Sequence, residues 1–372
     1  MTNSMADLYF PFRKLRILLV SFLRKWMKVS GVFFTLWGIG GLLLSCSPVR
    51  YVSIETYNPA GITFPQEVKN LLIVNHAVAQ PEVPYESTLV NRDDSLKLSA
   101  DSALFTFCRV LGTEIAASPY FKDVRMLEEG YRKDRYFFSD RMLTSNDVSL
   151  LCEEHEVDAV VSLDRLMFEI KESLQKGFDF EIEGWMAIEV SGVIRAYLPG
   201  SDAPLSTIEI VDTIYPQLMF DVLNMTTVFV DAEVLLQDAA TLVAKRSLVN
   251  FIPYWSGDAR WYYVSANAPW KEAGAYAASD KWEQAGEKWK KLFDSAADSS
   301  WKLRSRLASN LALASELTGD FSKALYWATE SFRLLEGRLN ENDAYYKLQK
   351  MYIDVLKYRI LADKRLHIQL KE

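Results

Sequence analysis

Apolar positions along the first two thirds of the chain follow the patterns of β-strands. Continuous apolar runs at 70–75 and 157–163 are typical of strands buried on both faces of a sheet. Along 185–198 and 205–214 apolar and polar residues alternate, and a Pro/Gly-rich stretch joins them, which predicts a hairpin. The strands expected in chain order are 50–56, 70–75, 124–127, 157–163 with a continuation to 170, 185–198 and 205–214.

Helical periodicity separates these strands. The first predicted helix carries an apolar stripe and ends at Pro119, the second covers 147–154, and a long third helix covers 226–249. The stripe of the first helix consists of Leu104, Cys108, Leu111 and Ile115. The candidate caps are Asp101 or Ser102 for the first helix and Ser145 or Asn146 for the second. Prolines and charged residues predict a loop over 76–100.

The order strand, helix, short strand, helix, strand, hairpin, helix resembles a known group of domains. It is similar to the small α/β domain shared by the amino-terminal domain of TolB and the curli-secretion lipoprotein CsgG, with Val157–Leu163 at the position of their third strand. The resemblance covers about residues 50–255, and it implies an α/β sandwich-type domain. Glu156-Val157-Asp158 stands where the family usually has Gly-Ala-Asp.

From Ala266 onward the pattern is helical. Trp282-x-x-Ala285-x-x-x-Trp289 aligns with Phe321-x-x-Ala324-x-x-x-Ala328, and the turn Thr318-Gly319-Asp320 precedes the second copy. Small residues and aromatics at this spacing resemble the tetratricopeptide repeat, which implies stacked helix pairs. The expected fold is therefore α+β, with an α/β domain over 46–255 and an all-α helical repeat domain over 256–372.

Charge is unevenly distributed along the chain. Residues 1–45 hold six basic residues and one acid, so the remainder keeps 36 of the 42 basic and 48 of the 49 acidic residues, a net charge of −12. Such an acidic body lacks the basic surface that nucleic-acid binding requires. We therefore expect no nucleic-acid partner.

The basic residues precede an apolar run, 29–44, which ends in Ser45 and Cys46. This order is typical of a signal peptide over residues 1–45. Leu43-Leu44-Ser45-Cys46 resembles the lipobox of bacterial lipoproteins, which implies lipid on the Cys46 thiol and a membrane contact through that lipid. Ser47-Pro48 favours the periplasmic face of the outer membrane. The alternative is an uncleaved transmembrane anchor, although the run is short and holds four glycines.

The lipobox, the α/β domain and the repeat-like tail together resemble uncharacterised lipoproteins of Bacteroidota. Two further cysteines, Cys108 and Cys152, lie among apolar neighbours in predicted helices. Buried free thiols are the default for such positions, and a disulfide is the alternative in an oxidising compartment.

Residues able to carry chemistry are few. His76 directly follows a buried strand, where it could act as a base or ligand or simply end the strand. Carboxylates at even spacing could pair for acid–base work, or form a solvated face. They are Asp158, Asp164 and Glu169 on one strand and Glu181, Glu183 and Glu189 on another. We expect no catalytic site, metal or cofactor.

Aromatic residues cluster where the two domains are expected to meet. Such density is typical of a binding surface or of interdomain packing. The residues proposed to contact a partner are Tyr254, Trp255, Trp261, Tyr262, Trp282 and Trp289.

The leading hypothesis is a non-catalytic cell-envelope lipoprotein that binds protein partners in envelope assembly, secretion or maintenance. The concave face of the helix stack would bind the partner. One alternative is an enzyme that processes envelope glycans or peptides. Another is a subunit of a CsgG-like secretion assembly.

Overall fold

The structure is a computed structural model that describes residues 49–87, 92–96, 99–132, 134, 136–137, 141–176, 182–216, 220–221, 226–227 and 232–370. It divides into two compact units. The sheet unit contains Glu55–Asp258 and the residues from Tyr358 onward, and the helical unit contains Ala259–Lys357 with the described part of Met1–Ile54. The fold mixes α and β structure and has a helical carboxyl-terminal region, which confirms the coarse α+β prediction.

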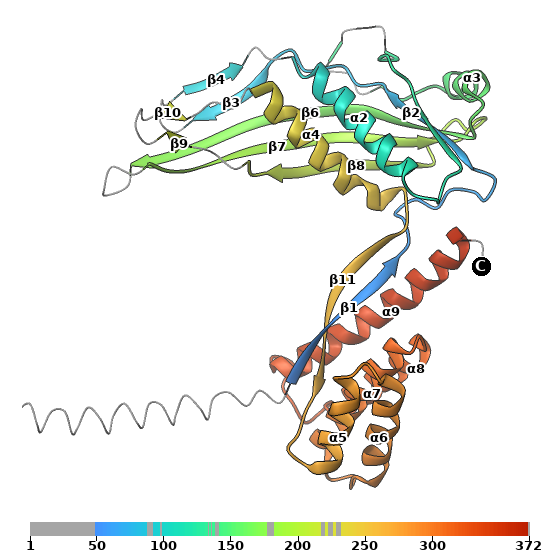
Figure 1. The fold of residues 1–372 in the computed structure, drawn as a ribbon, viewed down its shortest axis with the longest axis vertical. Helices are drawn as coiled ribbons and strands as arrows, with labels where there is room; N and C mark the ends of the chain where they lie inside the picture. The colour runs from blue at the N-terminus through green and yellow to red at the C-terminus, as the bar shows by residue number, and fades with distance from the viewer. Residues whose placement is uncertain are drawn as a thin grey trace, which may run out of the picture. The chain divides into compact units, whose positions relative to one another are not determined.

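A seven-stranded mixed sheet forms the centre of the sheet unit. Its strands are, in chain order, β2 (Asn70–Asn75), β3 (Val83–Ser87), β4 (Arg92–Leu96), β5 (Asp123–Met126), β6 (Ala159–Lys176), β7 (Ile182–Tyr197) and β8 (Ser206–Ile214). One edge of the long strand β6 pairs in parallel with β2 and, further along, with β3. Its other edge pairs antiparallel with β7, which pairs in turn with β8 (Figure 1).

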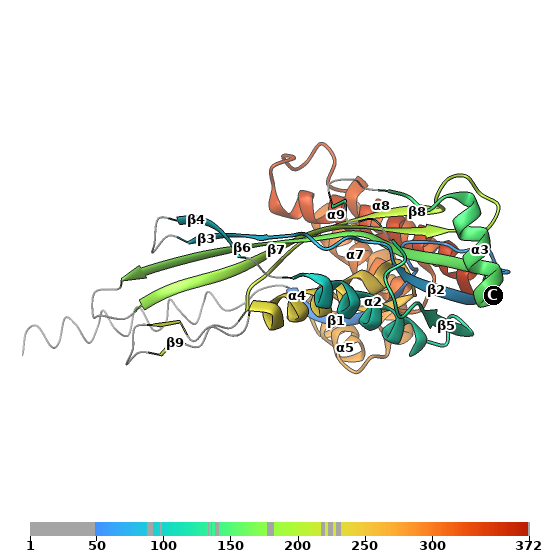
Figure 2. The same cartoon turned by 90° about the horizontal axis from the view of Figure 1, so that it is seen from above.

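Both faces of the sheet are covered at the β2 end. Leu71 and Ile73 belong to the apolar cluster beneath α2 (Asp101–Ala116) and α4 (Ala232–Ser247). Leu72 and Val74 belong to the cluster beneath α3 (Ser145–His155). Because successive strand residues point to opposite faces, α2 and α4 cover one face and α3 covers the other (Figure 2). This double burial explains the continuous apolar run of β2.

A bulge interrupts β6 at Asp164. Leu163 lies opposite Ile194, and Arg165 lies opposite Val193, so Asp164 is an extra residue without a partner position on β7. A bulge re-aims the side chains around it. After the bulge it is the even-numbered residues, such as Phe168, that face the helices. The odd-numbered residues beyond it therefore line the other face of β6.

Several sequence predictions need correction. The predicted loop over 76–100 contains the hairpin β3–β4, whose charged edge strand has no apolar alternation to reveal it. The predicted long helix begins at Ala232, and Thr226–Thr227 is instead strand β10, paired with β9 (Phe220–Asp221). The caps also differ, since Ala100 and Thr144 precede the first two helices, and Thr144 forms a capping box with Asp147.

A separate two-stranded sheet pairs β1 (Val49–Asn58) with β11 (Tyr254–Tyr263). The sequence predicted a domain boundary after residue 255, which lies inside β11, and the two units divide between Asp258 and Ala259 in the same strand. The short 3-10 helix η1 (Leu248–Asn250) links α4 to this strand.

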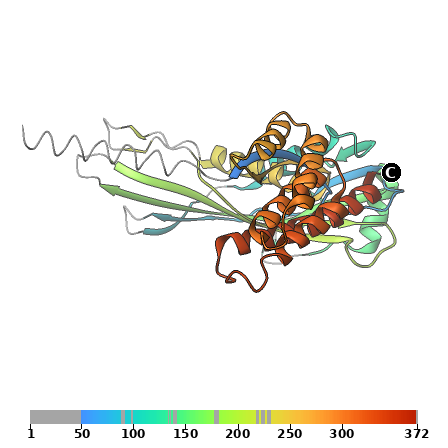
Figure 3. The same cartoon turned by 90° about the horizontal axis from the view of Figure 1, so that it is seen from below.

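The helical unit consists of neighbouring helices in chain order (Figure 3). They are α5 (Ala268–Ala277), α6 (Trp282–Ser295), α7 (Trp301–Leu317), α8 (Phe321–Arg333) and the first part of α9 (Ala344–Leu370). At the predicted turn, Gly319 has a φ of 83°, and the Asp320 side chain caps α8 by accepting from the Lys323 N–H. Across the described residues, no helix has the length and apolarity to cross a membrane.

Candidate functional site

Two residues that the sequence singled out separately lie together in the sheet unit. His76 directly follows β2, and its Nδ1 lies 3.4 Å from Oδ1 of Asp164, the bulged residue of β6. The His76 ring is 6.0 Å from the ring of Tyr131, which packs against the α3 cluster. The parallel pairing of β2 with β6 brings the two side chains together across 88 residues of chain.

The Asp164 carboxylate is fully buried and accepts several hydrogen bonds. Ser162 Oγ donates to Oδ1, Arg195 forms an ion pair with Oδ2, and the Tyr197 hydroxyl donates to Oδ2 at 3.3 Å. Burial, together with the charge of Asp164, raises the pKa of Tyr197 to about 12, so its hydroxyl keeps its proton at neutral pH.

This cluster could orient a histidine base, because Asp164 fixes one ring nitrogen of His76. However, the His76 side chain is only 9% exposed, and His76 lines neither of the two pockets described below. General-base catalysis requires the base to reach a substrate proton. The arrangement therefore supports a structural network better than a catalytic dyad.

The other candidate carboxylates have ordinary roles. Asp158 Oδ2 accepts from the backbone N–H groups of Lys69 and Asn70, both at 2.8 Å, and so fixes the start of β2 beside β6. Glu169 and Glu189 lie directly opposite one another on β6 and β7. Glu181 and the side chain of Glu183 lie outside the described residues.

Lys171 forms ion pairs with both Glu169 and Glu189. Its Nζ lies 2.9 Å from Glu189 Oε1 and 3.5 Å from Glu169 Oε1, and the hydrogen bond to Glu189 raises the pKa of Lys171. The Glu169 and Glu189 side chains are 43% and 44% exposed, so the three residues form a solvated ionic cluster on the surface of the sheet.

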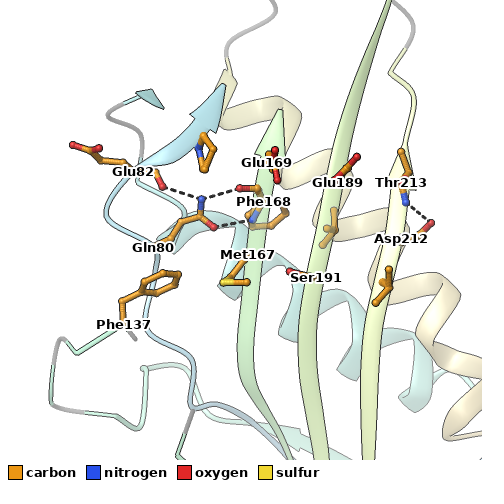
Figure 4. Close-up of a pocket in the computed structure, with 13 residues that line it drawn as sticks. Gln80, Glu82, Phe137, Met167, Phe168, Glu169, Glu189, Ser191, Asp212 and Thr213 are labelled. Atoms are coloured by element: carbon orange, nitrogen blue, oxygen red, sulfur yellow. Dashed lines mark hydrogen bonds between the residues drawn. The ribbon is translucent and has the colours of Figure 1, made fainter. Parts of the chain in front are cut away.

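A pocket of about 280 Å³ lies over β6, β7 and β8 (Figure 4). Phe137, Met167 and Val211 contribute apolar surface to it, and Glu169 and Glu189 lie at its margin. The main polar group in its wall is already bonded. Gln80 accepts from the Phe168 N–H at 2.7 Å and donates to the Phe168 carbonyl at 2.9 Å. Gln80 thus hydrogen-bonds the β6 backbone in the stretch that lies between its pairing with β2 and its pairing with β3.

The helical unit contains a second pocket, a groove of about 370 Å³ between α6, α7 and α8. Trp282 and Trp327 give it an aromatic lining, and Leu311 adds apolar surface from α7. Glu283 and Glu287 lie along α6 at its margin, and Lys323 lies on α8. Among the described residues, none of these three charged side chains forms an ion pair. The groove therefore joins aromatic surface to charges available for a ligand.

Most of the predicted contact aromatics are part of the core. Trp261, Tyr262 and Trp289 belong to the apolar cluster of the helical unit, and Trp289 is fully buried. These three side chains line neither pocket, so they are removed from the candidate binding surface. Trp282 belongs to the same cluster and is 8% exposed, and this exposed part of its ring lines the groove.

The two remaining aromatics belong to β11. Trp255 is 66% exposed, and its ring centroid lies 4.9 Å from that of Tyr57. Tyr254 is half-buried, and desolvation raises the pKa of its hydroxyl. Of the six predicted residues, Trp255 thus keeps most of its surface, Tyr254 keeps part of it, and Trp282 keeps the small part that lines the groove.

The sequence did not predict a buried ionic cluster in the helical unit. Arg260 donates to Glu316, with Nη2 at 2.9 Å from Oε1, and the Tyr352 hydroxyl donates to Glu316 Oε2 at 2.8 Å. The signal that could have revealed it is Glu316 itself, a lone acid at the end of a run of apolar and small residues in α7.

Cys108 and Cys152 are free and buried, which confirms the default interpretation. They lie in different apolar clusters, on opposite faces of the sheet. Desolvation raises the pKa of Cys108 to about 12 and that of Cys152 to about 11, so neither thiol is reactive at neutral pH. Cys46, the predicted lipid attachment site, lies outside the described residues.

Comparison with protein families gives two matches. The family described as a domain of unknown function, DUF8603, matches residues 68–263, more than half of the chain. The chain belongs to this family. A second domain of unknown function, DUF6340, matches residues 271–358. The first match spans most of the sheet unit and the second most of the helical unit. Comparison with curated proteins gives no match.

Two solved structures are similar to part of the chain. A dodecamer of a PelC variant from Paraburkholderia phytofirmans has 10% identity and a TM-score of 0.23, over 54% of this chain and 96% of that one. A protein from Helicobacter pylori, described as a homolog of a neuraminyllactose-binding hemagglutinin, has 11% identity and a TM-score of 0.25, over 53% of this chain and 89% of that one.

Proposed function

We propose that this chain is a non-catalytic, lipid-anchored cell-envelope protein whose helical unit binds a segment of a partner protein. The observation that carries the proposal is the groove between α6, α7 and α8. Apolar lining with a few charged groups at the margin is typical of sites that bind a peptide segment.

The groove also indicates the chemistry of its partner. Trp282 and Trp327 are 8% and 6% exposed, and the exposed parts of their rings in the groove suit a small apolar contact. Glu283 and Glu287 are one helical turn apart on α6 and suit a basic residue beside it. We therefore propose a segment with an apolar residue flanked by Lys or Arg.

The finer fold assignments belong to this proposal. The neighbouring pairs α5–α6 and α7–α8, with the buried Ala285 and Ala324 at matching positions, support a tetratricopeptide-like stack. The element order of the sheet unit supports the TolB-N/CsgG-like assignment. The basic, apolar and Cys46 pattern supports lipid attachment at the periplasmic face of the outer membrane, in a bacterium of the Bacteroidota.

One observation favours the alternative of an enzyme that acts on envelope glycans or peptides. Glu169 and Glu189 lie opposite one another and both line the pocket on the sheet. Glycoside hydrolysis uses such a carboxyl pair, but one member must hold a proton. Lys171 pairs with both side chains and both are close to half-exposed, so neither lies in a desolvated catalytic setting, which favours the binding function over this one.

Charge reversal at the groove tests the partner-binding proposal. The double variant Glu283→Lys with Glu287→Lys should bind the partner at least about tenfold more weakly, a loss of about 1.4 kcal/mol, because a basic segment is then repelled. The partner is first identified with a photo-crosslinking residue at Lys323, and its affinity for the full chain is then measured by calorimetry.

The matched control is Glu336→Lys with Glu341→Lys, which makes the same charge change at exposed positions of the helical unit outside the groove. The control should keep the parental affinity. Equal weakening by both double variants, or by neither, would argue against binding in the groove.

The anchor has its own test. Cys46→Ala should move the protein from the membrane fraction to the soluble fraction, because the thiol that would carry the lipid is lost. Membrane fractionation and the intact mass of the protein measure this, and Cys152→Ala serves as the control that keeps Cys46. If Cys46→Ala stays in the membrane at the parental mass, the lipid anchor is ruled out.

A further inference from the structure

The large sheet has three outer strands, and they differ in how they resist pairing with another chain. β5 is only four residues long, and β4 carries Arg92, Asp93 and Asp94 among its five residues. Short edges and charged edges are two of the ways in which proteins prevent strand addition. Both of these strands lie on the β2–β3 side of β6.

β8 is different. It is nine residues long, contains no Lys, Arg or Pro, and pairs only with β7 among the described strands (Figure 1). Its residues alternate between a face packed against α4, with Ile208 and Ile210, and the opposite face. A long regular edge of this kind offers a row of backbone donors and acceptors to another strand.

Two large apolar side chains near this edge are exposed. Val211 is 86% exposed, and Tyr215, the residue after Ile214, is 68% exposed. Within β8, Val211 lies on the face away from α4, as does Glu209. The acid on the other face, Asp212, already binds Arg246 of α4, with Nη1 at 2.6 Å from Oδ1.

We propose that β8 pairs antiparallel with β8 of a second copy of this chain, around a two-fold axis that passes through Val211. A two-fold axis perpendicular to the sheet places odd-numbered residues opposite odd-numbered ones. The side chains that face away from α4 in the two copies then lie on the same side of the joined sheet. Backbone hydrogen bonds between the two edges then extend one continuous sheet across both copies.

The side chains select this register. With the axis at Val211, the two Val211 side chains meet and Glu209 lies opposite Thr213. On the other face Ile208 lies opposite Ile214, and Ile210 lies opposite Asp212, whose carboxylate already binds Arg246. An axis at Glu209 would place two carboxylates opposite each other, which is unfavourable. The self-complementary register favours a second copy over an unrelated strand.

The oligomeric state of the full chain in mild detergent tests the proposal. Sedimentation velocity over a wide range of concentration should give a dimer, and Val211→Lys should raise the dimer dissociation constant at least about tenfold, because two lysines meet at the axis. The matched control is Val234→Lys on an exposed position of α4, which should keep the dimer.

A cysteine at the axis tests the register. In antiparallel pairs the opposing Cα atoms lie about 4.5–5.5 Å apart, within the range for a disulfide. Val211→Cys should therefore form a disulfide-linked dimer under mild oxidation, while Val234→Cys should not. A wild-type monomer at all concentrations, or a Val211→Lys variant that dimerises as the parent does, would overturn the proposal. So would a dimer whose Val211→Cys variant does not crosslink.

Discussion

Replacing Glu316 with alanine is expected to lower the free energy of unfolding of the helical unit by about 3–5 kcal/mol. Glu316 is almost fully buried, and its carboxylate accepts from the Arg260 guanidinium and from the Tyr352 hydroxyl. Without it, the buried Arg260 guanidinium loses this partner, and the desolvation of its charge is less well offset. Urea denaturation followed by tryptophan fluorescence measures the loss, because Trp261 lies 5.2 Å from Tyr352, centroid to centroid.

The matched control is Glu330→Ala, the same substitution at an ion pair of the same unit. Glu330 binds Arg333 at 2.7 Å, but the Arg333 side chain is 62% exposed. A surface pair of this kind contributes about 0–1 kcal/mol. A loss at Glu316 no larger than the loss at Glu330 would show that the buried cluster does not hold the unit together.

Asp164→Asn is expected to destabilise the sheet unit by about 3–5 kcal/mol. The substitution keeps the shape of the side chain but removes the charge that faces Arg195, and it introduces an amide N–H₂ group where Ser162 and Tyr197 now donate. Hydrogen exchange at the β2 and β6 amides measures the effect, because Asp164 links the bulge of β6 to His76 at the end of β2.

The control for this prediction is Asp123→Asn, which removes the same charge from the same sheet. Asp123 binds Arg125 at 2.8 Å, and both side chains are close to half-exposed, so the expected loss is about 0–1 kcal/mol. If Asp164→Asn and Asp123→Asn change the protection of the β2 and β6 amides equally, the buried network does not stabilise the sheet.

Strands with a strong apolar signal could be predicted from the sequence. The bounds of β2 agree with the predicted 70–75, and the hairpin β7–β8 was predicted from alternation on both sides of a Pro/Gly-rich turn. These strands have at least one buried face, so their side chains carry a pattern. β3 and β4 gave no such pattern, because the core residues Val83 and Tyr85 of β3 are two alternate positions, too few to form one, and β4 is rich in charged residues.

The candidate sites could be predicted only in part. His76 and Asp164 were each candidates on sequence grounds, but their contact depends on the β2–β6 register and on a bulge that no local pattern predicts. For the aromatic residues, the pattern shows which side chains are present but not which of them are buried. Trp255 and Trp289 have the same side chain, yet the first is exposed and the second lies in the core.

What the sequence by itself determined is the local structure: the apolar runs of β2 and β6, the helical stripe of α2, and the Thr318-Gly319-Asp320 turn before α8. Each follows from steric and hydrophobic preferences that act within a few residues. Only the tertiary structure decided which side chains meet, such as Arg260 with Glu316, and which residues line the groove. It also decided that one edge of β8 has no partner among the described strands. The reason is physical: these contacts join segments far apart in the chain, and their burial and charge pairing exist only after the helices and strands have packed.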